Sequence, residues 1–225
     1  MDTVRSIQSG LIAFTERGWL TEIIVCNNNS TDRTAELARN LGVRVIFEPV
    51  NQISRARNTG AAAATGQWLL FVDADSRPSR ELFADVLAAM ERGECVAGGA
   101  TVRLDGHYPV ASLIVSAWNA VSRLRRWMAG SFIFCEATAF REAGGFSQEL
   151  FAGEELELSQ KLKELARKRR KRVVILHRHP IATSARKIHL YSAWEHFRFL
   201  AWTALVAGRT LRNRESCPTW YDGRR

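Results

Sequence analysis

Two aspartates that directly follow an apolar run are the residues best suited to chemistry. Asp73 and Asp75 are separated by one alanine and come after residues 68–72, which show no polar alternation. Neighbouring carboxylates repel each other, and a divalent cation offsets this repulsion and can bridge them to a diphosphate. The alternative is an Asx turn that leads into a helix N-terminus, where acidic residues are also favoured. The pattern favours a site for a magnesium-like ion at the end of a strand.

A second group of acidic residues, Glu154, Glu155 and Glu157, opens a predicted helix late in the chain. The helix dipole favours negative charge at this position, which explains the group without any catalysis. In the catalytic interpretation, one of the first two glutamates is a general base for an attacking hydroxyl. A neighbouring acid would raise the pKa of that base towards the working pH.

Two further pairs of residues could assist such a site. Arg55 and Arg57 are two apart in a predicted helix and point to different sides, so we expect one to bind phosphate or a base edge and the other to be surface charge. His177 and His179 are two apart in a predicted strand and face the same way. A lone histidine is more often structural, and the alternative is a third metal ligand, for which His179 is the candidate.

Short apolar runs alternate with helical patterns in the first half of the chain, and this alternation predicts how the site is positioned. We expect strand–helix pairs at residues 22–26 and 31–41, 43–47 and 53–65, and 68–72 and 81–91. Such repeats predict an α/β fold, with a mostly parallel central sheet and helices on both faces. Ligands bind at the carboxyl ends of such strands, so the polar residues 27–30 and 73–75 should share one rim.

The second half of the chain is less regular. We expect strands at 96–102, 131–135 and 173–176, helices at 110–127 and 154–166, and a turn at 144–146. Residues 190–208 have the pattern of an amphipathic helix. We therefore assign residues 1–189 to one α/β domain and residues 190–225 to a C-terminal amphipathic helix and tail.

Composition is that of an ordinary globular protein. The chain has 225 residues, of which 46% are hydrophobic and 24% charged. It contains no apolar run long enough to span a membrane, and its N-terminus lacks the pattern of a signal peptide. The four cysteines form no C-x-x-C pair, which predicts reduced, mostly buried thiols in a cytoplasmic protein.

The net charge of +9 is concentrated in one window. Residues 161–189 hold eleven Lys and Arg residues against one acid, Glu164. This window could attract phosphates or anionic lipid headgroups, and the alternative is a solvated turn between a helix and a strand. No nucleic-acid partner is expected, because interleaved aromatic residues and reader motifs are absent. This charge and the 190–208 helix suggest two candidate properties. They are peripheral contact with the inner membrane face and a lipid-linked acceptor.

Five motifs occur in the order seen in family 2 glycosyltransferases of the GT-A fold, and the chain resembles this family from about residue 20 to residue 185. They lie at residues 22–34, 56–60, 71–75, 144–146 and 153–158. The resemblance implies a GT-A-type nucleotide-binding sandwich and an inverting transfer from a nucleotide-diphosphate sugar to an acceptor hydroxyl. The chain lacks the Gln-x-x-Arg-Trp motif of processive polysaccharide synthases, which favours transfer of a single sugar.

The resemblance also implies roles for individual residues. Asp75 would bind Mg²⁺ or Mn²⁺, and Asp73 would lie near the metal or near the ribose of a UDP- or GDP-type donor. Glu155 would be the general base, with Glu154 supporting it. The other donor-binding residues would be Asn27, Asn29, Ser30 and Arg57.

Three features depart from the family pattern. Family members begin with an apolar strand, whereas this chain begins with a predicted helix at 3–17, so we expect the first strand to lie upstream of Met1 or to be missing. Without that internal strand, the backbone edge of its neighbour would be exposed. Asn27 stands where an aspartate is usual, which would alter nucleotide binding. Glu155 replaces the commoner aspartate, which lengthens the arm of the base by about one methylene.

Two other functions remain open from the sequence. A sugar-nucleotide pyrophosphorylase has a similar sheet but needs a glycine-rich phosphate loop near its N-terminus, which this sequence lacks. A non-catalytic binding or scaffold protein would follow if Asn27 and the missing strand abolish donor binding. Its basic window and its 190–208 helix would then dock on a membrane or a partner.

Overall fold

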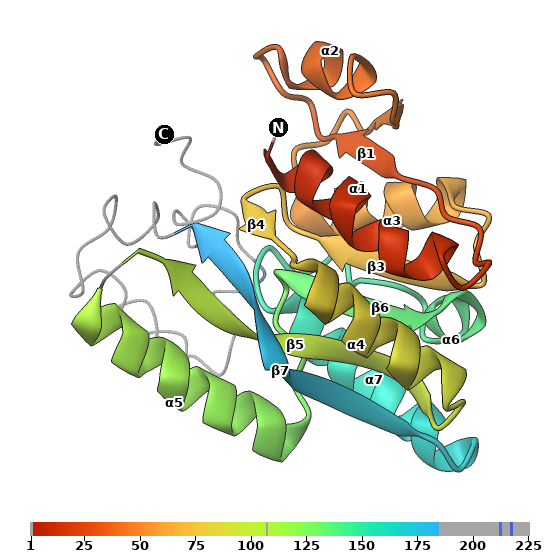
Figure 1. Ribbon diagram of the computed structural model, residues 1–225, viewed down its shortest axis with the longest axis vertical. Helices are drawn as coiled ribbons and strands as arrows, with labels where there is room; N and C mark the ends of the chain where they lie inside the picture. The colour runs from red at the N-terminus through yellow and green to blue at the C-terminus, as the bar shows by residue number, and fades with distance from the viewer. Residues whose placement is uncertain (1, 107, 185–211, 213–216, 218–225) are drawn as a thin grey trace.

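The computed structural model describes residues 2–106 and 108–184, together with Arg212 and Cys217 (Figure 1). Apart from those two positions, the C-terminal unit predicted at 190–225 and its amphipathic helix at 190–208 lie outside the described residues. None of the four cysteines, all of which lie within the described residues, takes part in a disulfide, and three of them are buried, as predicted. No described helix is long and apolar enough to cross a membrane.

The first half of the chain folds into the elements that its periodicity predicts. They are α1 (Asp2–Thr15), β1 (Ile24–Asn27), α2 (Thr34–Arg39), β2 (Arg44–Phe47), α3 (Ile53–Ala63), β3 (Trp68–Val72) and α4 (Arg80–Glu91). Ser79 caps α4, because its hydroxyl oxygen accepts a hydrogen bond from Leu82 N at 3.2 Å.

The remaining elements include two short ones that the sequence does not reveal. They are β4 (Ser76–Arg77), which lies between β3 and α4, and then β5 (Cys95–Asp105), α5 (Pro109–Arg125), β6 (Phe132–Glu136), α6 (Ala137–Glu142), α7 (Glu154–Lys168) and β7 (Arg172–Ser184). β4 and α6 are too short to show a period. β7 continues eight residues beyond the predicted end at 176, because it goes on to pair with β5 and β4 through a polar stretch.

The strands form two sheets. β1 and β2 make a parallel pair, and the larger sheet has the order β3-β6-β5-β7-β4. Only β5 and β7 run parallel in the larger sheet, and its other three pairs are antiparallel. The α/β class is confirmed, but the expectation of a mostly parallel central sheet was wrong for this larger sheet. β6 returns antiparallel between β3 and β5, and the local pattern of strands and helices does not specify that placement.

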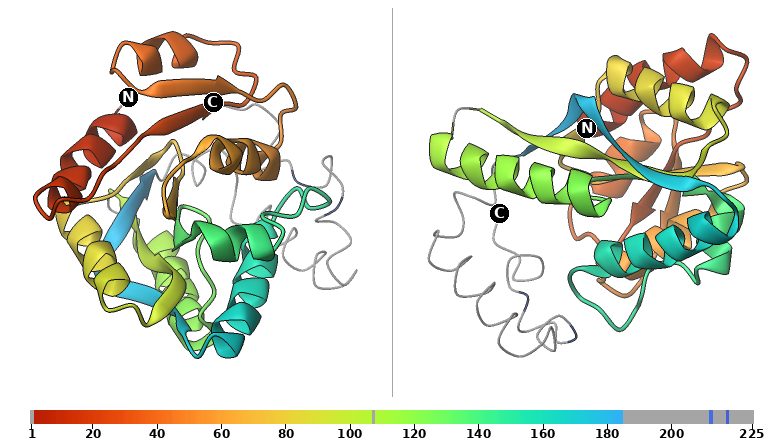
Figure 2. Two further views of the ribbon diagram at one scale, coloured as in Figure 1. Left: turned by 90° about the vertical axis from the view of Figure 1, so that its right-hand side faces the viewer. Right: turned by 90° about the horizontal axis from the view of Figure 1, so that it is seen from below.

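β1 and β3 each have one edge that no described strand covers. β1 pairs only with β2, and β3 pairs only with β6. The β1–β2 pair lies between α2 and α3, away from the larger sheet (Figure 2). Within the described residues, β1 therefore has an uncovered backbone edge of the kind that the sequence leads us to expect.

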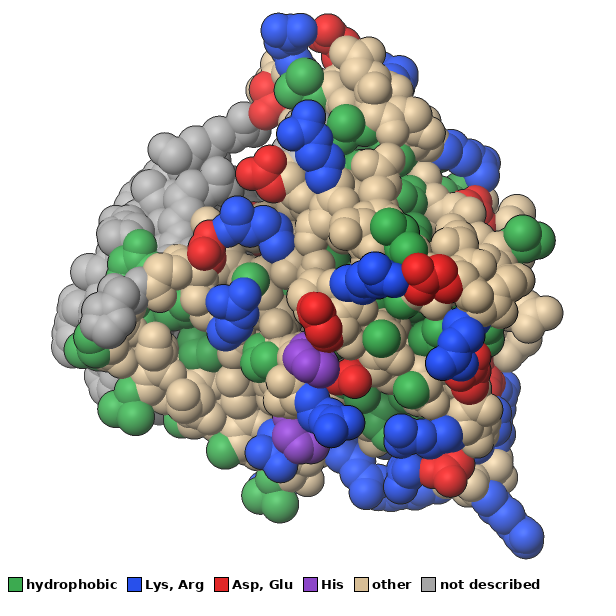
Figure 3. Space-filling view, in the orientation of Figure 1, with side chains coloured by type: hydrophobic (Ala, Val, Ile, Leu, Met, Phe, Trp, Pro, Cys, Tyr) green, Lys and Arg blue, Asp and Glu red, His purple; other side chains and the backbone are tan. Residues whose placement is uncertain are grey.

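The described part of the basic window, residues 161–184, forms the second half of α7, a turn and β7, and four of its cations, Lys161 among them, form ion pairs. Arg169 and Lys171 both bind Glu136, at 2.8 and 2.6 Å, and Arg169 also contacts Glu142 at 2.5 Å. Arg172 pairs with Glu94. Figure 3 shows Lys and Arg side chains along the lower part of the molecule with acidic side chains between them.

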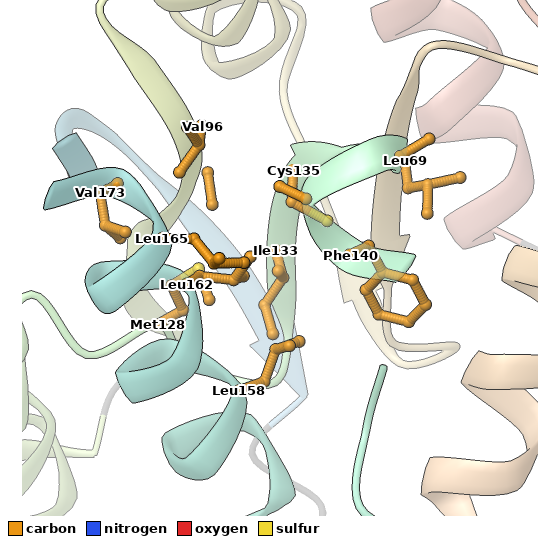
Figure 4. Close-up of a cluster of buried hydrophobic side chains, with 14 of the residues drawn as sticks. Leu69, Val96, Met128, Ile133, Cys135, Phe140, Leu158, Leu162, Leu165 and Val173 are labelled. Atoms are coloured by element: carbon orange, nitrogen blue, oxygen red, sulfur yellow. The ribbon is translucent and has the colours of Figure 1, made fainter. Parts of the chain in front are cut away.

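The core lies on both faces of the larger sheet. Phe132 and Phe134 of β6 point into one cluster, which also holds buried side chains of α1 and α4. Ile133 and Cys135 point into the other cluster, where the apolar face of α7 covers the sheet (Figure 4). That face consists of Leu158, Leu162 and Leu165. Helices on both faces are confirmed, and α3 and α7 are fixed beside the end of β3.

Candidate active site

Arg57, in the middle of α3, is the centre of a charged site at the end of β3. Its Nη1 donates to Glu154 Oε1 at 2.8 Å, and its Nη2 donates to Asp73 Oδ1 at 2.7 Å and to the Gly130 carbonyl at 2.8 Å. Burial by itself lowers the pKa of the guanidinium, but Asp73, Glu154 and Glu155 outweigh this effect and raise it. One cation therefore joins the two acidic motifs that the sequence singles out.

The turn at residues 144–146, which contains two glycines, packs against Arg57. The guanidinium carbon lies 5.1 Å from the centre of the Phe146 ring, a cation–π contact. Asn58, the next residue on α3, binds the backbone of Phe146 on both sides, donating to its carbonyl at 2.8 Å and accepting from its N–H at 3.0 Å. Gly144 and Gly145 precede Phe146 with φ of 79° and 70°, a conformation that favours glycine. The motif at residues 56–60 thus contacts the motif at residues 144–146.

Arg55 faces away from this site, as the spacing of the two arginines predicts. Its Nε donates at 3.0 Å to Glu48, a buried residue that follows β2. Glu48 also accepts from the Thr59 hydroxyl at 2.7 Å and from Val50 N at 3.0 Å. The Thr59 hydroxyl, then the Val50 N–H, lower the pKa of Glu48. Arg55 is part of an anchor for α3, which differs from the expected surface charge.

A pocket of about 200 Å³ opens beside Arg57. Its lining residues are Ile53, Arg57, Asp73, Gly130, Ser131, Gly153, Glu154 and Glu155. Four of the predicted site residues therefore share one cavity, and they come from α3, the end of β3 and the start of α7. The pocket holds three carboxylates and one guanidinium, an arrangement suited to moving a proton beside a cationic ligand or metal.

The two glutamates of the pocket differ in their surroundings. Glu154 is buried and held by Arg57 in an ion pair. Burial, together with the negative charge of Glu154, raises the pKa of Glu155 to about 7, and the charge of Arg57 opposes this rise. A carboxyl group with a pKa near neutrality is able both to accept and to release a proton under working conditions.

The aspartates at the end of β3 provide oxygen ligands. Asp73 Oδ1 binds Arg57, yet the Asp73 side chain is 39% exposed, and Asp75 lies two residues further along a half-buried segment. Mg²⁺ is commonly bound through one or two carboxylates and the phosphates of a substrate, so this donor set fits such an ion. The described residues contain no group of three or more His, Cys, Asp or Glu side chains arranged to hold a metal.

His179 does not join these aspartates, which corrects the expectation of a third metal ligand. Its Nδ1 lies 2.9 Å from Asp85 Oδ2 on α4. Because β7 runs far beyond its predicted end, His179 lies in the middle of a strand that faces α4. Its partner is 94 residues away in the sequence, and no local pattern indicates that contact.

The polar residues after β1 form a turn of their own and do not line the pocket. Asn27 Oδ1 accepts a hydrogen bond from Ser30 N at 3.0 Å, and Asn29 has a positive φ of 55°. Asn28 Oδ1 is buried and has no hydrogen-bond partner among the described residues. The expectation that Asn27, Asn29 and Ser30 bind a nucleotide sugar stays a prediction.

Residues 10–142, more than half of the chain, match the sequence profile described as "Glycosyl transferase family 2". The chain belongs to glycosyl transferase family 2. Three of the motifs on which the resemblance rests, at 22–34, 56–60 and 71–75, lie within the matched region. The other two contribute the Phe146 turn and the glutamates of the pocket.

Related proteins match this family 2 chain over part of their length. An uncharacterized glycosyltransferase of Mycobacterium tuberculosis is 31% identical over 106 residues, which cover 45% of this chain and 49% of that protein. EpsJ of Bacillus subtilis, also an uncharacterized glycosyltransferase, is 36% identical over 78 residues, 32% of this chain and 23% of EpsJ. The matched part spans less than half of each relative.

Solved structures establish the fold of the family 2 chain. The mannosyltransferase PcManGT of Pyrobaculum calidifontis, in complex with GDP-Man and Mn²⁺, superposes with a TM-score of 0.63 at 18% identity. That match covers 97% of this chain and 64% of PcManGT. TarS 1–349 of S. aureus has a TM-score of 0.58 at 16% identity, over 88% of this chain and 61% of TarS. The fold is of GT-A type, as expected.

Sequence reasoning missed Ser131, which lines the pocket. Its hydroxyl oxygen is buried without a hydrogen-bond partner among the described residues, and its carbonyl accepts a hydrogen bond from Asp73 N at 3.2 Å. A buried hydroxyl without a partner is available to a ligand. Because Ser131 precedes a strand without any motif of its own, its only sequence signal is its place beside Gly130.

Proposed function

We propose that this family 2 chain is an inverting, metal-dependent glycosyltransferase, which moves a single sugar from a nucleotide-diphosphate sugar to an acceptor hydroxyl. The observation that carries this proposal is that a glutamate with a raised pKa and an aspartate of the D-x-D motif line the same pocket. Glu155, with a pKa of about 7, lies beside Asp73, and Arg57 joins Asp73 to Glu154. The pocket therefore combines a carboxyl group suited to act as a base with the first residue of the D-x-D motif.

The proposed reaction is a direct displacement at the anomeric carbon. The acceptor hydroxyl oxygen attacks this carbon while its proton passes to a Glu155 carboxylate oxygen. The bond between the anomeric carbon and the diphosphate oxygen breaks, and the nucleoside diphosphate leaves with the bonding electron pair. Because attack and departure occur on opposite faces, the configuration inverts. The pocket walls hold the two reactants in line.

Arg57 has a positioning role in this proposal. Its ion pair with Glu154 fixes the first turn of α7, and its bond to Asp73 fixes the end of β3. Its charge also opposes the rise in the pKa of Glu155 and so keeps the base near neutrality. A Mg²⁺ or Mn²⁺ ion held by Asp75 and Asp73 would supply positive charge to the leaving diphosphate.

The donor in this proposal is of UDP or GDP type. Solved neighbours contain UDP, UDP-GlcNAc or GDP-Man, and two of them contain Mn²⁺. In this chain, the turn after β1 would contribute Asn27, Asn29 and Ser30 to nucleotide binding. Buried Asn28 Oδ1 and Ser131 Oγ, which have no partner among the described residues, are further candidates for donor contacts. We also propose a cytoplasmic location, which the lack of a disulfide among the four described cysteines supports.

Replacement of the base tests the proposal. Glu155→Gln removes the proton acceptor but keeps the size of the side chain, so we expect turnover of a UDP- or GDP-sugar to fall by about 10²–10⁴-fold while donor binding is kept. Release of the nucleoside diphosphate measures turnover. The wild-type rate should rise with pH through about 7, because the base must be ionised.

Glu157→Gln is the matched control, since Glu157 lies in the same helical turn and pairs with Lys161 at the surface. We expect it to keep wild-type turnover. Full turnover in Glu155→Gln would show that another group is the base. If wild type binds no nucleotide diphosphate, the non-catalytic binding protein becomes the better account.

A further inference from the structure

Helix α5 presents a stripe of aliphatic side chains to solvent. Its other face is fixed on β5, where the Asn119 amide accepts from Val102 N at 2.9 Å and donates to Val102 O at 2.8 Å. At about 100° per residue, the stripe is centred opposite Asn119. Its side chains are 42–83% exposed, and they are Val110, Leu113, Ile114, Val121 and Leu124. Figure 3 shows hydrophobic side chains along the lower left edge, over α5.

The C-terminal end of α5 carries positive charge. The helix contains no Asp or Glu, and it ends with Arg123 and Arg125 in its last turn. A hollow of about 240 Å³ beside this end is lined by Arg123, Arg126, Arg172 and His177, together with residues 173–175 of β7. Arg172 also pairs with Glu94, whereas Arg123 and Arg126 have no ion pair within the described residues. An anionic group would fit this hollow.

Two contacts join the basic end to the rest of the molecule. Lys163 Nζ of α7 donates to the Arg125 carbonyl at 2.9 Å, which adds a cation at the end of the helix dipole. The Arg125 guanidinium lies 5.9 Å from the centre of the Trp127 ring. Tryptophan favours the boundary between apolar and aqueous phases. The last member of the apolar stripe, Leu124, therefore lies between Arg123 and Arg125, and Trp127 follows two residues beyond the end of the helix.

We propose that α5 docks on the surface of an anionic phospholipid bilayer. The aliphatic stripe enters the boundary between headgroups and acyl chains, and the arginines at the end of the helix bind lipid phosphates. A bilayer offers an apolar layer beside an anionic layer, which matches an uncharged stripe beside a cationic end. With 17 residues, α5 lies on the bilayer and does not cross it.

Docking would bring the catalytic pocket to the membrane surface. Gly130 and Ser131, which line that pocket, follow the end of α5 at Arg125 by five and six residues. A lipid-linked acceptor could then present its hydroxyl beside Glu155 without leaving the bilayer. The docking itself does not depend on the transferase reaction, because it involves neither the donor nor the carboxylates.

Vesicle flotation without nucleotide tests the docking. We expect the full chain to float with vesicles that contain phosphatidylglycerol, and to bind phosphatidylcholine vesicles weakly. Leu113→Ser combined with Leu124→Ser should lower the partition coefficient at least about tenfold, because two leucines lose their burial in lipid. Arg123→Gln should lower binding only to the anionic vesicles, and salt should do the same.

Exposed residues on other parts of the surface provide matched controls for the α5 variants. Leu20→Ser with Leu37→Ser, and Arg39→Gln on α2, remove the same chemistry from other surfaces. We expect these variants to float like wild type. Equal flotation of the α5 and control variants would overturn the proposal. It would also be overturned if wild type fails to float and instead forms a dimer that Leu113→Ser with Leu124→Ser dissociates, since the stripe would then bind a second copy.

Discussion

At the scale of single residues, the two acidic motifs act through one arginine. Arg57 contacts Asp73 and Glu154 directly, so a charge on α3 orders carboxylates that lie 81 residues apart in the chain. The residue types and the family order were enough to predict Arg57, Asp73, Glu154 and Glu155 as site residues, and the structure brings all four into one pocket. It does not bring His179 there.

The raised pKa of Glu155 predicts a stability effect of Glu155→Gln. The folded-state pKa of about 7 exceeds the usual 4.5, so between these pH values the folded state binds more protons than the unfolded state. Wild-type stability therefore falls as pH rises through this window, by about 3 kcal/mol in total. The neutral amide avoids this loss, so the variant should be more stable than wild type at about pH 8 but not at about pH 4.

Urea unfolding at the two pH values measures this effect. Glu157→Gln is again the control, because its carboxylate is at the surface beside Lys161. A stabilisation by Glu155→Gln that is the same at both pH values would contradict a pKa near 7.

At the scale of elements, α3 is the part that positions the site. Its first half is held by Glu48 after β2, and Asn58 holds it to the turn before α7. The periodicity predicts α3, β3 and α7 well, because each has a long apolar face or run. The partners Glu48 and Asn58 could not be predicted, because they are fixed by contacts between segments far apart in the sequence.

The glycine turn provides a prediction at this scale. Both Gly144 and Gly145 have positive φ, but a Cβ on Gly144 would meet no atom within 4 Å, whereas one on Gly145 would lie 2.8 Å from Asn58 Oδ1. Gly144→Ala should therefore cost about 1–2 kcal/mol of stability from backbone strain alone. Gly145→Ala should cost more and should also lower turnover, because Phe146 and Arg57 shift with the turn.

Urea unfolding and turnover of the two variants provide the comparison. Gly144→Ala is the control for the backbone cost, since a Cβ on Gly145 would meet Asn58 Oδ1 at 2.8 Å and the Phe140 ring at 3.3 Å, whereas one on Gly144 would meet neither. Equal losses of stability in both variants, with equal turnover, would show that the Asn58 contact does not position α3.

At the scale of the whole molecule, the features that could not be predicted from the sequence are those that depend on contacts between distant segments. The helix and strand order predicts an α/β fold of GT-A type, but not the antiparallel entry of β6 between β3 and β5. Likewise, the basic window at 161–189 looks like unpaired charge in the sequence, whereas Glu94, Glu136 and Glu142 pair with Arg169, Lys171 and Arg172. Local patterns contain no information on such partners.

The central claim, metal-dependent binding of a nucleotide-diphosphate donor at this pocket, is tested most directly by thermal unfolding with UDP or GDP, with and without Mn²⁺. At a ligand concentration of about 100 Kd, binding stabilises the folded state by about 2.7 kcal/mol, which raises the Tm by several degrees. We expect this rise in wild type and in Glu155→Gln when Mn²⁺ is present, and we expect Asp75→Ala to lose it. If neither nucleotide raises the wild-type Tm in the presence of Mn²⁺, the glycosyltransferase account is contradicted.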